Sequence, residues 1–376
     1  MPKSNSALVR GLPGAVLVAL SLASCTARPG PDTLATVRAL PSGATRTVEV
    51  YTVTTRSRET PDRNIFGAGK SPAPNYARMM ISIPPGHKAS NIEWPKGKPD
   101  PKKSFAVVGQ SVLDRDAFLH QVKTDLAAQT RIGLFVHGYN TNYQESVFRL
   151  AQLSTDADVK GMPVLFSWPS QGALAGYVAD KEAATYSRDD LADLLLELTR
   201  DRGPDQIYVF AHSMGGWLLV EALRQLKLQG RDDVIARLNV ILAAPDIDAD
   251  VFRTQMRVIG KMERPMTILV SADDRALAVS GLLSASSQRV GTLDVKDPRV
   301  QEAAVAAGVK IIDISTVAPT DSVNHARFAD IADLYPALTA RPKTNDLGQA
   351  GAFVFDAAAM TVSSPFRLVS KTLSGQ

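Results

Sequence analysis

A serine lies at a turn between a short apolar run and a helical segment, within residues 207–219. The apolar run has the character of a buried strand, and the residues after the turn repeat at helical spacing. At such a turn the backbone of Ser213 is strained, which lifts its hydroxyl out of the sheet. Strand and helix pass so closely there that the flanking positions must be small, as Ala211 and Gly215 are. Because a helix N-terminus favours negative charge, this segment predicts a nucleophilic serine beside an oxyanion site.

The segment resembles the nucleophile elbow of the α/β-hydrolases, G-x-S-x-G, with Ala211 in place of the first glycine. A second motif, His-Gly-Tyr-Asn at residues 137–140, follows an earlier strand-like run and is similar to the oxyanion loop of the same family. The resemblance implies that the backbone N–H groups of Tyr139 and Met214 bind the oxyanion that develops on a substrate carbonyl. For the side chain of His137 we expect a structural role, closing the turn.

The resemblance also implies the rest of a catalytic triad, in the chain order Ser, Asp, His. The other four histidines lie before the elbow serine, at His87, His120, His137 and His212, so the base falls on His325. This residue follows the last strand-like run and opens a helical stretch over 325–330. The family draws its acid from the loop after the seventh strand, where we favour Asp274 over Asp273, with Asp246 third. The structural alternative for Asp274 or Asp273 is an N-cap of the next helix.

The elements that must position these residues follow from the hydrophobic pattern. Six apolar runs read as strands, at 133–136, 164–166, 207–210, 240–242, 268–270 and 311–314. Helical stretches lie between them, such as 180–200, whose leucines recur at i, i+3, i+4 and i+7. Continuous apolar strands separated by amphipathic helices predict an α/β fold with a mainly parallel sheet covered on both faces. Two further strands are predicted at 48–54 and 79–83, followed by a Pro- and Lys-rich solvated loop at 84–103.

Further fragments at 54–56, 166–170 and 243–248 strengthen the match, so that the resemblance covers about residues 48–340. They are similar to a bacterial envelope branch of esterase/lipase-like α/β-hydrolases with mostly unassigned substrates. The resemblance implies a serine hydrolase that cleaves small acyl esters or thioesters through an acyl-enzyme. The competing hypothesis is a non-catalytic binding module of the cell envelope, because this fold hosts many functions.

The first 24 residues have the pattern of an export signal. Lys3 and Arg10 precede an apolar run at 12–22, which is too short for a stable membrane span. Small residues then lead into Cys25, an arrangement that resembles the bacterial lipobox, in which the cysteine is lipidated. Because Thr26 rather than Asp follows, the resemblance favours the outer membrane, with the protein facing the periplasm.

The remaining layout is a flexible tether at 25–46, a hydrolase domain at 47–340 and an irregular extension at 341–376. Within the domain, residues 47–128 hold N-terminal strands and a loop, and 129–340 the catalytic core. A net charge of +4, from 42 basic and 38 acidic residues, is too mild to suggest nucleic-acid binding. The single cysteine excludes an internal disulfide framework, and no metal or cofactor motif is present. The sequence does not determine the oligomeric state.

Overall fold

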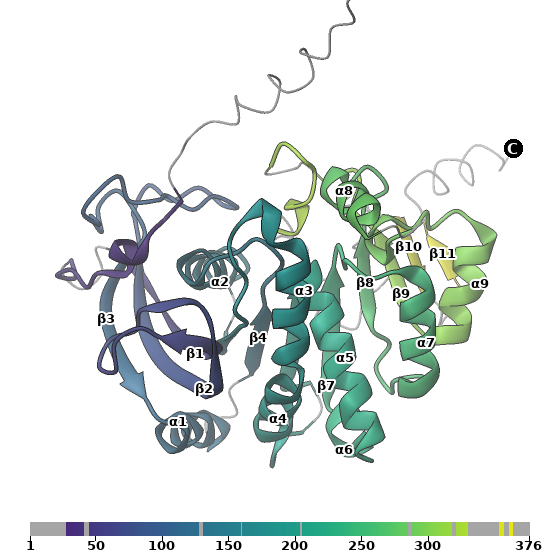
Figure 1. Ribbon diagram of the computed structural model, residues 1–376, viewed down its shortest axis with the longest axis horizontal. Helices are drawn as coiled ribbons and strands as arrows, with labels where there is room; N and C mark the ends of the chain where they lie inside the picture. The colour runs from purple at the N-terminus through teal and green to yellow at the C-terminus, as the bar shows by residue number, and fades with distance from the viewer. Residues whose placement is uncertain are drawn as a thin grey trace, which may run out of the picture.

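The computed structural model describes residues 28–40, 45–127, 131–158, 160–203, 205–284, 288–317, 321–329, 353–356 and 361–363. These residues form one eleven-stranded sheet in the order β11-β10-β9-β8-β7-β6-β4-β5-β1-β2-β3, flanked by helices (Figure 1). The strands are β1 Arg46–Arg58, β2 Phe66–Ile83, β3 Ala106–Leu113, β4 Ile132–Val136, β5 Met162–Ser167, β6 Ile207–His212, β7 Leu238–Ala243, β8 Thr267–Val270, β9 Lys310–Asp313, β10 Phe353–Asp356 and β11 Thr361–Ser363. The predicted α/β class is therefore confirmed.

The middle of the sheet is parallel and its two edges are antiparallel. Parallel pairing links β1, β5, β4, β6, β7, β8 and β9. At one edge β2 and β3 add antiparallel strands, and at the other β10 and β11 do so. Each strand predicted from an apolar run is present, because these runs supply the buried rows that a doubly covered sheet needs.

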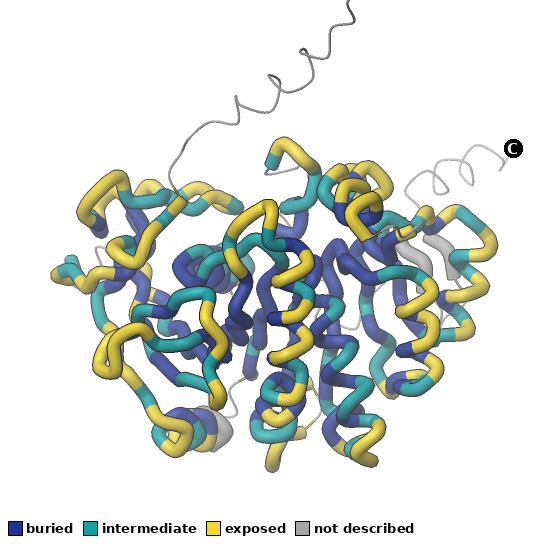
Figure 2. Tube along the Cα trace, viewed as in Figure 1, coloured by how far each residue is buried: buried dark blue, intermediate teal, exposed yellow. Residues whose placement is uncertain are grey.

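Helices cover both faces of this sheet, and side chains alternate between the two cores. In β4, Leu134 and Val136 pack on one face while Phe135 packs on the other, as the period of two in a strand requires. The first face carries α1 Arg115–Ala127, α3 Tyr177–Tyr186, α4 Arg188–Thr199, α5 Met214–Leu228, α7 Ala249–Ile259 and α9 Pro298–Ala307. The other face carries α2 Tyr143–Asp156. In Figure 2 the buried residues gather in the middle of the molecule, where the strands lie, and the exposed ones lie on its outer turns. The short helices α6 Asp232–Ile235 and α8 Arg275–Leu283 complete the set.

Three segments differ from expectation. The stretch 180–200 is two helices, α3 and α4, because the buried Ser187 hydroxyl donates to the Ala183 carbonyl and shares a 2.7 Å hydrogen bond with Thr55 Oγ1 where the chain bends. Residues 28–40, expected within a flexible tether, lie against the body with Leu34 buried in the core.

The C-terminal extension is not irregular throughout. Its described residues form β10 and β11, so that part of it extends the sheet beyond β9. Within the described residues, no helix is both long enough and apolar enough to cross a bilayer. The predicted export signal and Cys25 lie outside the described residues.

Candidate active site

Ser213 lies on a strained turn between β6 and α5, as the sequence predicts. Its backbone has φ 54° and ψ −124°, a conformation that L-residues rarely adopt. Three backbone hydrogen bonds hold the turn: Ser213 donates to the Ala243 carbonyl, and its own carbonyl accepts from Gly216 and Asp246. Neighbouring strand and helix therefore over-determine the geometry and maintain the strain.

Two glycines permit this close approach. A Cβ on Gly215 would lie 2.3 Å from the His137 carbonyl oxygen, so α5 can pack against the end of β4 only without a side chain there. A Cβ on Gly138 would lie 2.9 Å from the Cβ of Ser213 and 2.8 Å from Nδ1 of His212. The loop after β4 is thereby held directly against Ser213, the position that an oxyanion loop would occupy if Ser213 were the nucleophile.

The two amides expected to bind an oxyanion belong to the loop after β4 and to the first residue of α5. Met214 is the first residue of α5, so its N–H has no acceptor within the helix. The N–H of Tyr139 likewise has no hydrogen-bond partner in the described part of the chain. Asp180 orients the loop, because its buried carboxylate accepts from the backbone N–H of Asn140 at 3.2 Å and from the Ser170 hydroxyl at 2.5 Å. The loop thus presents backbone donors without relying on the His137 side chain.

His325 and Asp274 form a direct pair. Nδ1 of the imidazole lies 2.7 Å from Oδ2 of the carboxylate, although 51 residues separate them in the chain. The other oxygen of Asp274 accepts from the Leu277 amide at 3.0 Å and caps α8. The same side chain thus makes both contacts that the sequence analysis considered, one to the candidate base and one that caps the next helix. Asp321 holds the histidine loop by accepting from the backbone N–H groups of His325 and Ala326. The predicted helical stretch here is reduced to a short turn at 327–329.

The environment of His325 favours its protonated form. Burial lowers its pKa, but the hydrogen bond and negative charge of Asp274 outweigh that effect and leave the pKa above its ordinary value. The imidazole side chain is 16% exposed, while the carboxylate is fully buried. A proton received by the ring is therefore stabilised by a charge that water does not screen.

The ring of His325 lies beside the elbow rather than on the serine hydroxyl. It packs on the ring of His212, the residue before Ser213, with 4.5 Å between ring centroids. Burial keeps the pKa of His212 well below its ordinary value, so this neighbour stays neutral. Within the described residues, Ser213 Oγ and His325 Nε2 are not hydrogen-bonded to each other or to any other group. The structure therefore brings Asp274 and His325 together and packs the His325 ring on the residue before Ser213, without a hydrogen bond to the serine hydroxyl.

The alternative acids are engaged elsewhere. Asp273 is held by Arg327 through two hydrogen bonds of 2.6 and 2.8 Å, and this pairing lowers its pKa to about 2. Asp246 is buried and accepts from Tyr177 and Ser280, with Arg289 at 3.2 Å. Among the three carboxylates, Asp274 alone contacts the imidazole in the described residues.

Arg56 and Trp168 lie in the fragments 54–56 and 166–170, for which the sequence predicted no chemical role. In the structure both side chains support the loop at 137–141. The guanidinium of Arg56 is buried and donates to the Thr141 and Ser170 carbonyls and to the Ser167 hydroxyl. Burial lowers its pKa to about 10. Trp168 stacks on His137 and donates to its carbonyl oxygen at 2.8 Å. The sequence did offer a signal for Arg56, namely an arginine near the end of a buried strand. A charge at such a place needs hydrogen-bond partners, because burying it unpaired would be costly.

His137 itself is structural. Its Nδ1 hydrogen-bonds to the Gly138 carbonyl and its Nε2 to the Ser167 hydroxyl, which leaves neither nitrogen for catalysis. Burial, aided by the charge of Arg56, lowers its pKa to about 3, so the ring is neutral. Across the described residues, no group of three or more His, Cys, Asp or Glu side chains could hold a metal ion.

The sheet topology and the serine turn at the carboxyl ends of its parallel strands define the class of α/β-hydrolases. A family model described as alpha/beta hydrolase of unknown function (DUF900) matches residues 114–341, and the chain belongs to this family.

Individual relatives are more distant. A stretch of 62 residues is 44% identical to the uncharacterized protein alr1448 of Nostoc sp., but the chain spans only 16% of that relative's length. The esterase of Pyrobaculum calidifontis is 12% identical, with 78% of this chain and 85% of that chain covered and a TM-score of 0.35. The carboxylesterase EstE1 from a metagenomic library is 13% identical, with 76% and 87% covered and a TM-score of 0.31. These likenesses are too distant to describe the site.

Proposed function

We propose that the protein is a serine hydrolase that cleaves carboxylic esters or thioesters through Ser213, His325 and Asp274. The observation that carries the proposal is the 2.7 Å contact between His325 Nδ1 and the buried Asp274, beside a serine held at φ 54°. The pairing favours the tautomer in which Nδ1 carries the proton, so that Nε2 carries the lone pair that a base needs.

In the proposed reaction, Ser213 Oγ attacks the acyl carbonyl while His325 Nε2 takes the hydroxyl proton. The Tyr139 and Met214 amides stabilise the oxyanion, and Asp274 stabilises the imidazolium. His325 then gives its proton to the leaving alcohol or thiol, which leaves the acyl group on Ser213. Water attacks this acyl-enzyme with His325 as base, releasing the acid. The contact between Oγ and Nε2 must tighten when substrate binds, as catalytic hydrogen bonds often do.

A fluorophosphonate probe tests the nucleophile. We expect covalent labelling of the wild type, none of Ser213→Ala, and strongly reduced labelling of His325→Ala. His120→Ala, which changes an exposed histidine on α1, is the control and should label normally. Labelling that survives Ser213→Ala would exclude this serine. A folded wild type that neither labels nor cleaves p-nitrophenyl esters of any chain length would favour the binding module instead.

We propose further that Cys25 is lipidated and holds the domain on the periplasmic side of the outer membrane. The support is the sequence before it: a basic start, a short apolar run that ends at Leu22, and the small residues Ala23 and Ser24. Replacing Cys25 by Ser should release the protein into the soluble fraction of a cell lysate. Membrane association that persists unchanged in this variant would contradict lipidation.

A further inference from the structure

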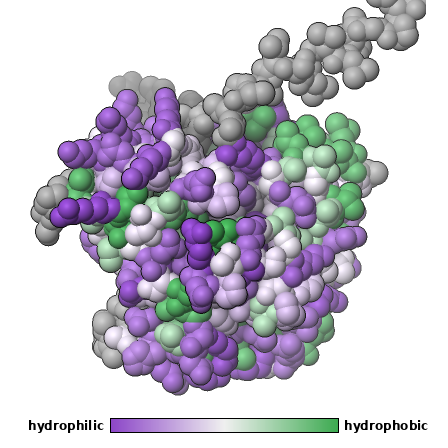
Figure 3. All heavy atoms as spheres, turned by 60° about the vertical axis from the view of Figure 1, so that its left-hand side comes forward, coloured by the Kyte–Doolittle hydropathy of each residue, from purple (hydrophilic) through white to green (hydrophobic). Residues whose placement is uncertain are grey.

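Exposed apolar side chains gather on two elements at one end of the molecule. Leu174 and Val178, on the 3-10 turn Leu174–Gly176 and the start of α3, are 77% and 70% exposed. On α8, Val279, Leu282 and Leu283 are 55%, 82% and 61% exposed. Figure 3 shows hydrophobic side chains gathered at the upper edge of the molecule, the end that carries α8 in Figure 1. Clustered exposure of this kind marks an interaction surface, whereas isolated apolar residues do not.

The two elements are fastened to each other and to the candidate active site. Tyr177 at the start of α3 and Ser280 on α8 both donate to the carboxylate of Asp246. The backbone N–H of Asp246 in turn donates to the carbonyl of Ser213. On the other side, the Tyr139 hydroxyl donates to the Leu174 carbonyl. The apolar surface formed by Leu174, Val178, Val279, Leu282 and Leu283, called the rim below, is therefore linked through Asp246 to the turn that holds Ser213.

The N-terminal segment reaches the molecule at the same rim. Arg28 donates to the Gly172 carbonyl, to the side chain and carbonyl of Asn140, and to the carboxylate of Glu145. Gly172 is two residues before Leu174, and Asn140 follows Tyr139 in the oxyanion loop. The chain before Arg28 therefore starts from this rim. Cys25 is three residues away, a reach of about 10 Å even for fully extended chain.

The charges of the rim suit an anionic lipid surface. Residues 168–178 contain no charged side chain, and α8 contains one, Arg275, with no carboxylate. The exposed leucines and valines of the rim, with Arg275 on α8, match the interfacial zone of a bilayer with anionic headgroups. The exposed carboxylate of Glu182 lies one turn after Val178 on α3.

We propose that this rim rests on a phospholipid leaflet and that the site takes its acyl ester from that leaflet, so that the substrate class is a membrane-resident acyl lipid. The inference rests on the proposed serine-hydrolase function. Arg28 fixes the orientation, because it ties the segment that follows the proposed lipid anchor Cys25 beside the loop at 137–140. The exposed leucines then enter the interface, where each buried apolar side chain adds affinity in proportion to its area.

The test compares one enzyme on two substrates. Full-length protein is incorporated in vesicles of phosphatidylethanolamine and phosphatidylglycerol, and release of fatty acid from the vesicle lipid is measured. Hydrolysis of a short, soluble p-nitrophenyl ester is measured on the same sample. The double variant Leu282→Ser, Leu283→Ser should lower turnover of vesicle lipid about tenfold and leave turnover of the soluble ester unchanged.

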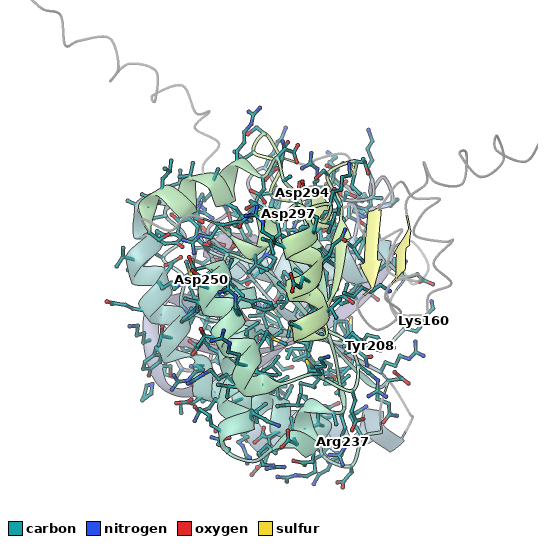
Figure 4. The ribbon with its side chains drawn as sticks, turned by 90° about the vertical axis from the view of Figure 1, so that its right-hand side faces the viewer. Lys160, Tyr208, Arg237, Asp250, Asp294 and Asp297 are labelled. Carbon is teal, nitrogen blue, oxygen red and sulfur yellow. The ribbon has the colours of Figure 1, made fainter. Side chains whose placement is uncertain are left out.

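Leu228→Ser is the matched control. Leu228 is 59% exposed and ends α5, the helix whose first turn adjoins Ser213, so it lies at the opposite end of the domain. Arg237 follows α6, the short helix that comes directly after α5. Figure 4 shows Arg237 at the lower end of the molecule. Both substrates should be turned over normally by this variant, and melting temperatures should match the wild type in both cases.

The outcomes separate the two proposals. Wild type that cleaves the soluble ester but not the vesicle lipid, or double-variant and control rates that fall equally, would overturn the membrane-facing rim while leaving the hydrolase intact. Wild type that cleaves neither substrate would overturn the hydrolase itself. A Cys25→Ser protein that dimerises in solution, and loses the dimer in the double variant, would assign the rim to a second copy of the chain and also overturn the proposal.

Discussion

Two histidines in this molecule pair with carboxylates at nearly the same distance. They differ in whether one ring nitrogen is left without a hydrogen bond. His87 lies in the loop between β2 and β3, with Nδ1 2.7 Å from Glu93 and Nε2 2.8 Å from Asp156. His325 pairs through Nδ1 alone, and its Nε2 has no hydrogen-bond partner in the described residues. For both rings the carboxylates outweigh burial and raise the pKa. A raised pKa therefore does not by itself point to a catalytic base, and the proposal for His325 rests instead on its free Nε2 and on its place beside the strained serine turn.

The location of the two pairs explains this difference. The two carboxylates around His87 come from its own loop and from α2, so the ring fastens that loop to the helix. The partner of His325 comes from the start of α8, and both ends of the contact lie at the carboxyl edge of the parallel sheet. In an open α/β sheet that edge is where ligands bind. The first pair stabilises an edge of the fold, and the second lies where a substrate can reach it.

The largest difference in kcat is expected between the variants that remove the imidazole of His325 and that of His87. His325→Ala should lower kcat for a p-nitrophenyl ester by about 10⁶, because loss of the base disables the whole triad. His87→Ala should leave kcat and KM within about twofold, because neither nitrogen of that ring faces the site. Steady-state kinetics on folded variants measures both. Equal losses in the two variants would show that the free nitrogen does not distinguish the pairs.

Removing the carboxylate charge sharpens the comparison. Asp274→Asn should lower kcat by about 10⁴, since the imidazole loses the charge that stabilises its protonated form. Asparagine is also a good N-cap, so α8 should remain intact. Because Asp274 raises the pKa of His325, the acidic limb of the rate profile should move to lower pH in this variant.

The control for that substitution is Asp156→Asn, which makes the same change beside His87. It should leave the rate and its pH profile unaltered and lower the melting temperature instead. A pH profile for Asp274→Asn that coincides with the wild type would contradict the role of Asp274 as the partner of the base.

The loop at 137–140 and the loop that holds His87 also differ in how much space surrounds their glycines. Gly138→Ala would place a Cβ within 2.9 Å of Ser213 and displace the oxyanion loop, so kcat should fall about 10²–10³, the loss typical of one oxyanion donor. Gly86, next to His87, has nothing within 4 Å of a Cβ, and Gly86→Ala should have no effect on kcat. KM should change little for either variant, since the oxyanion forms only in the transition state. A normal kcat for Gly138→Ala would move the oxyanion hole away from this loop.

The serine turn and the strands were predictable from the sequence because their signals are local. Ser213 lies inside a strand-turn-helix pattern whose small residues can be counted directly. The sequence around Asp273 and Asp274 does not show which of them faces the histidine. Asp273 pairs with Arg327, 54 residues later, and only the folded structure reveals that pairing. The break at Ser187 likewise depends on Thr55, which belongs to a distant strand.

The sequence analysis missed the buried charged residues near the site, because their partners also lie far away in the sequence. Asp180 and Arg56 hold the oxyanion loop through hydrogen bonds to backbone groups, and a sequence does not display which backbone groups a side chain will meet. The loop at 84–103 was expected to be a solvated loop. Its His87 is instead fastened to α2 and packs on the ring of Phe105, with 5.3 Å between centroids.

The smallest expected effect is a pH-dependent change in stability. The pKa of folded His87 lies above its ordinary value of 6.5, so its charged pairing stabilises the fold fully below that value. This contribution is lost as the pH rises through the folded pKa. His87→Gln should therefore melt about 2–4 °C below the wild type near pH 5, and the difference should shrink near pH 9. His120→Gln, which changes an exposed histidine, should match the wild type at both pH values. A difference for His87→Gln that stays constant with pH would mean that the ring fastens the loop by packing and neutral hydrogen bonds alone, and that the contrast with His325 is one of geometry without charge.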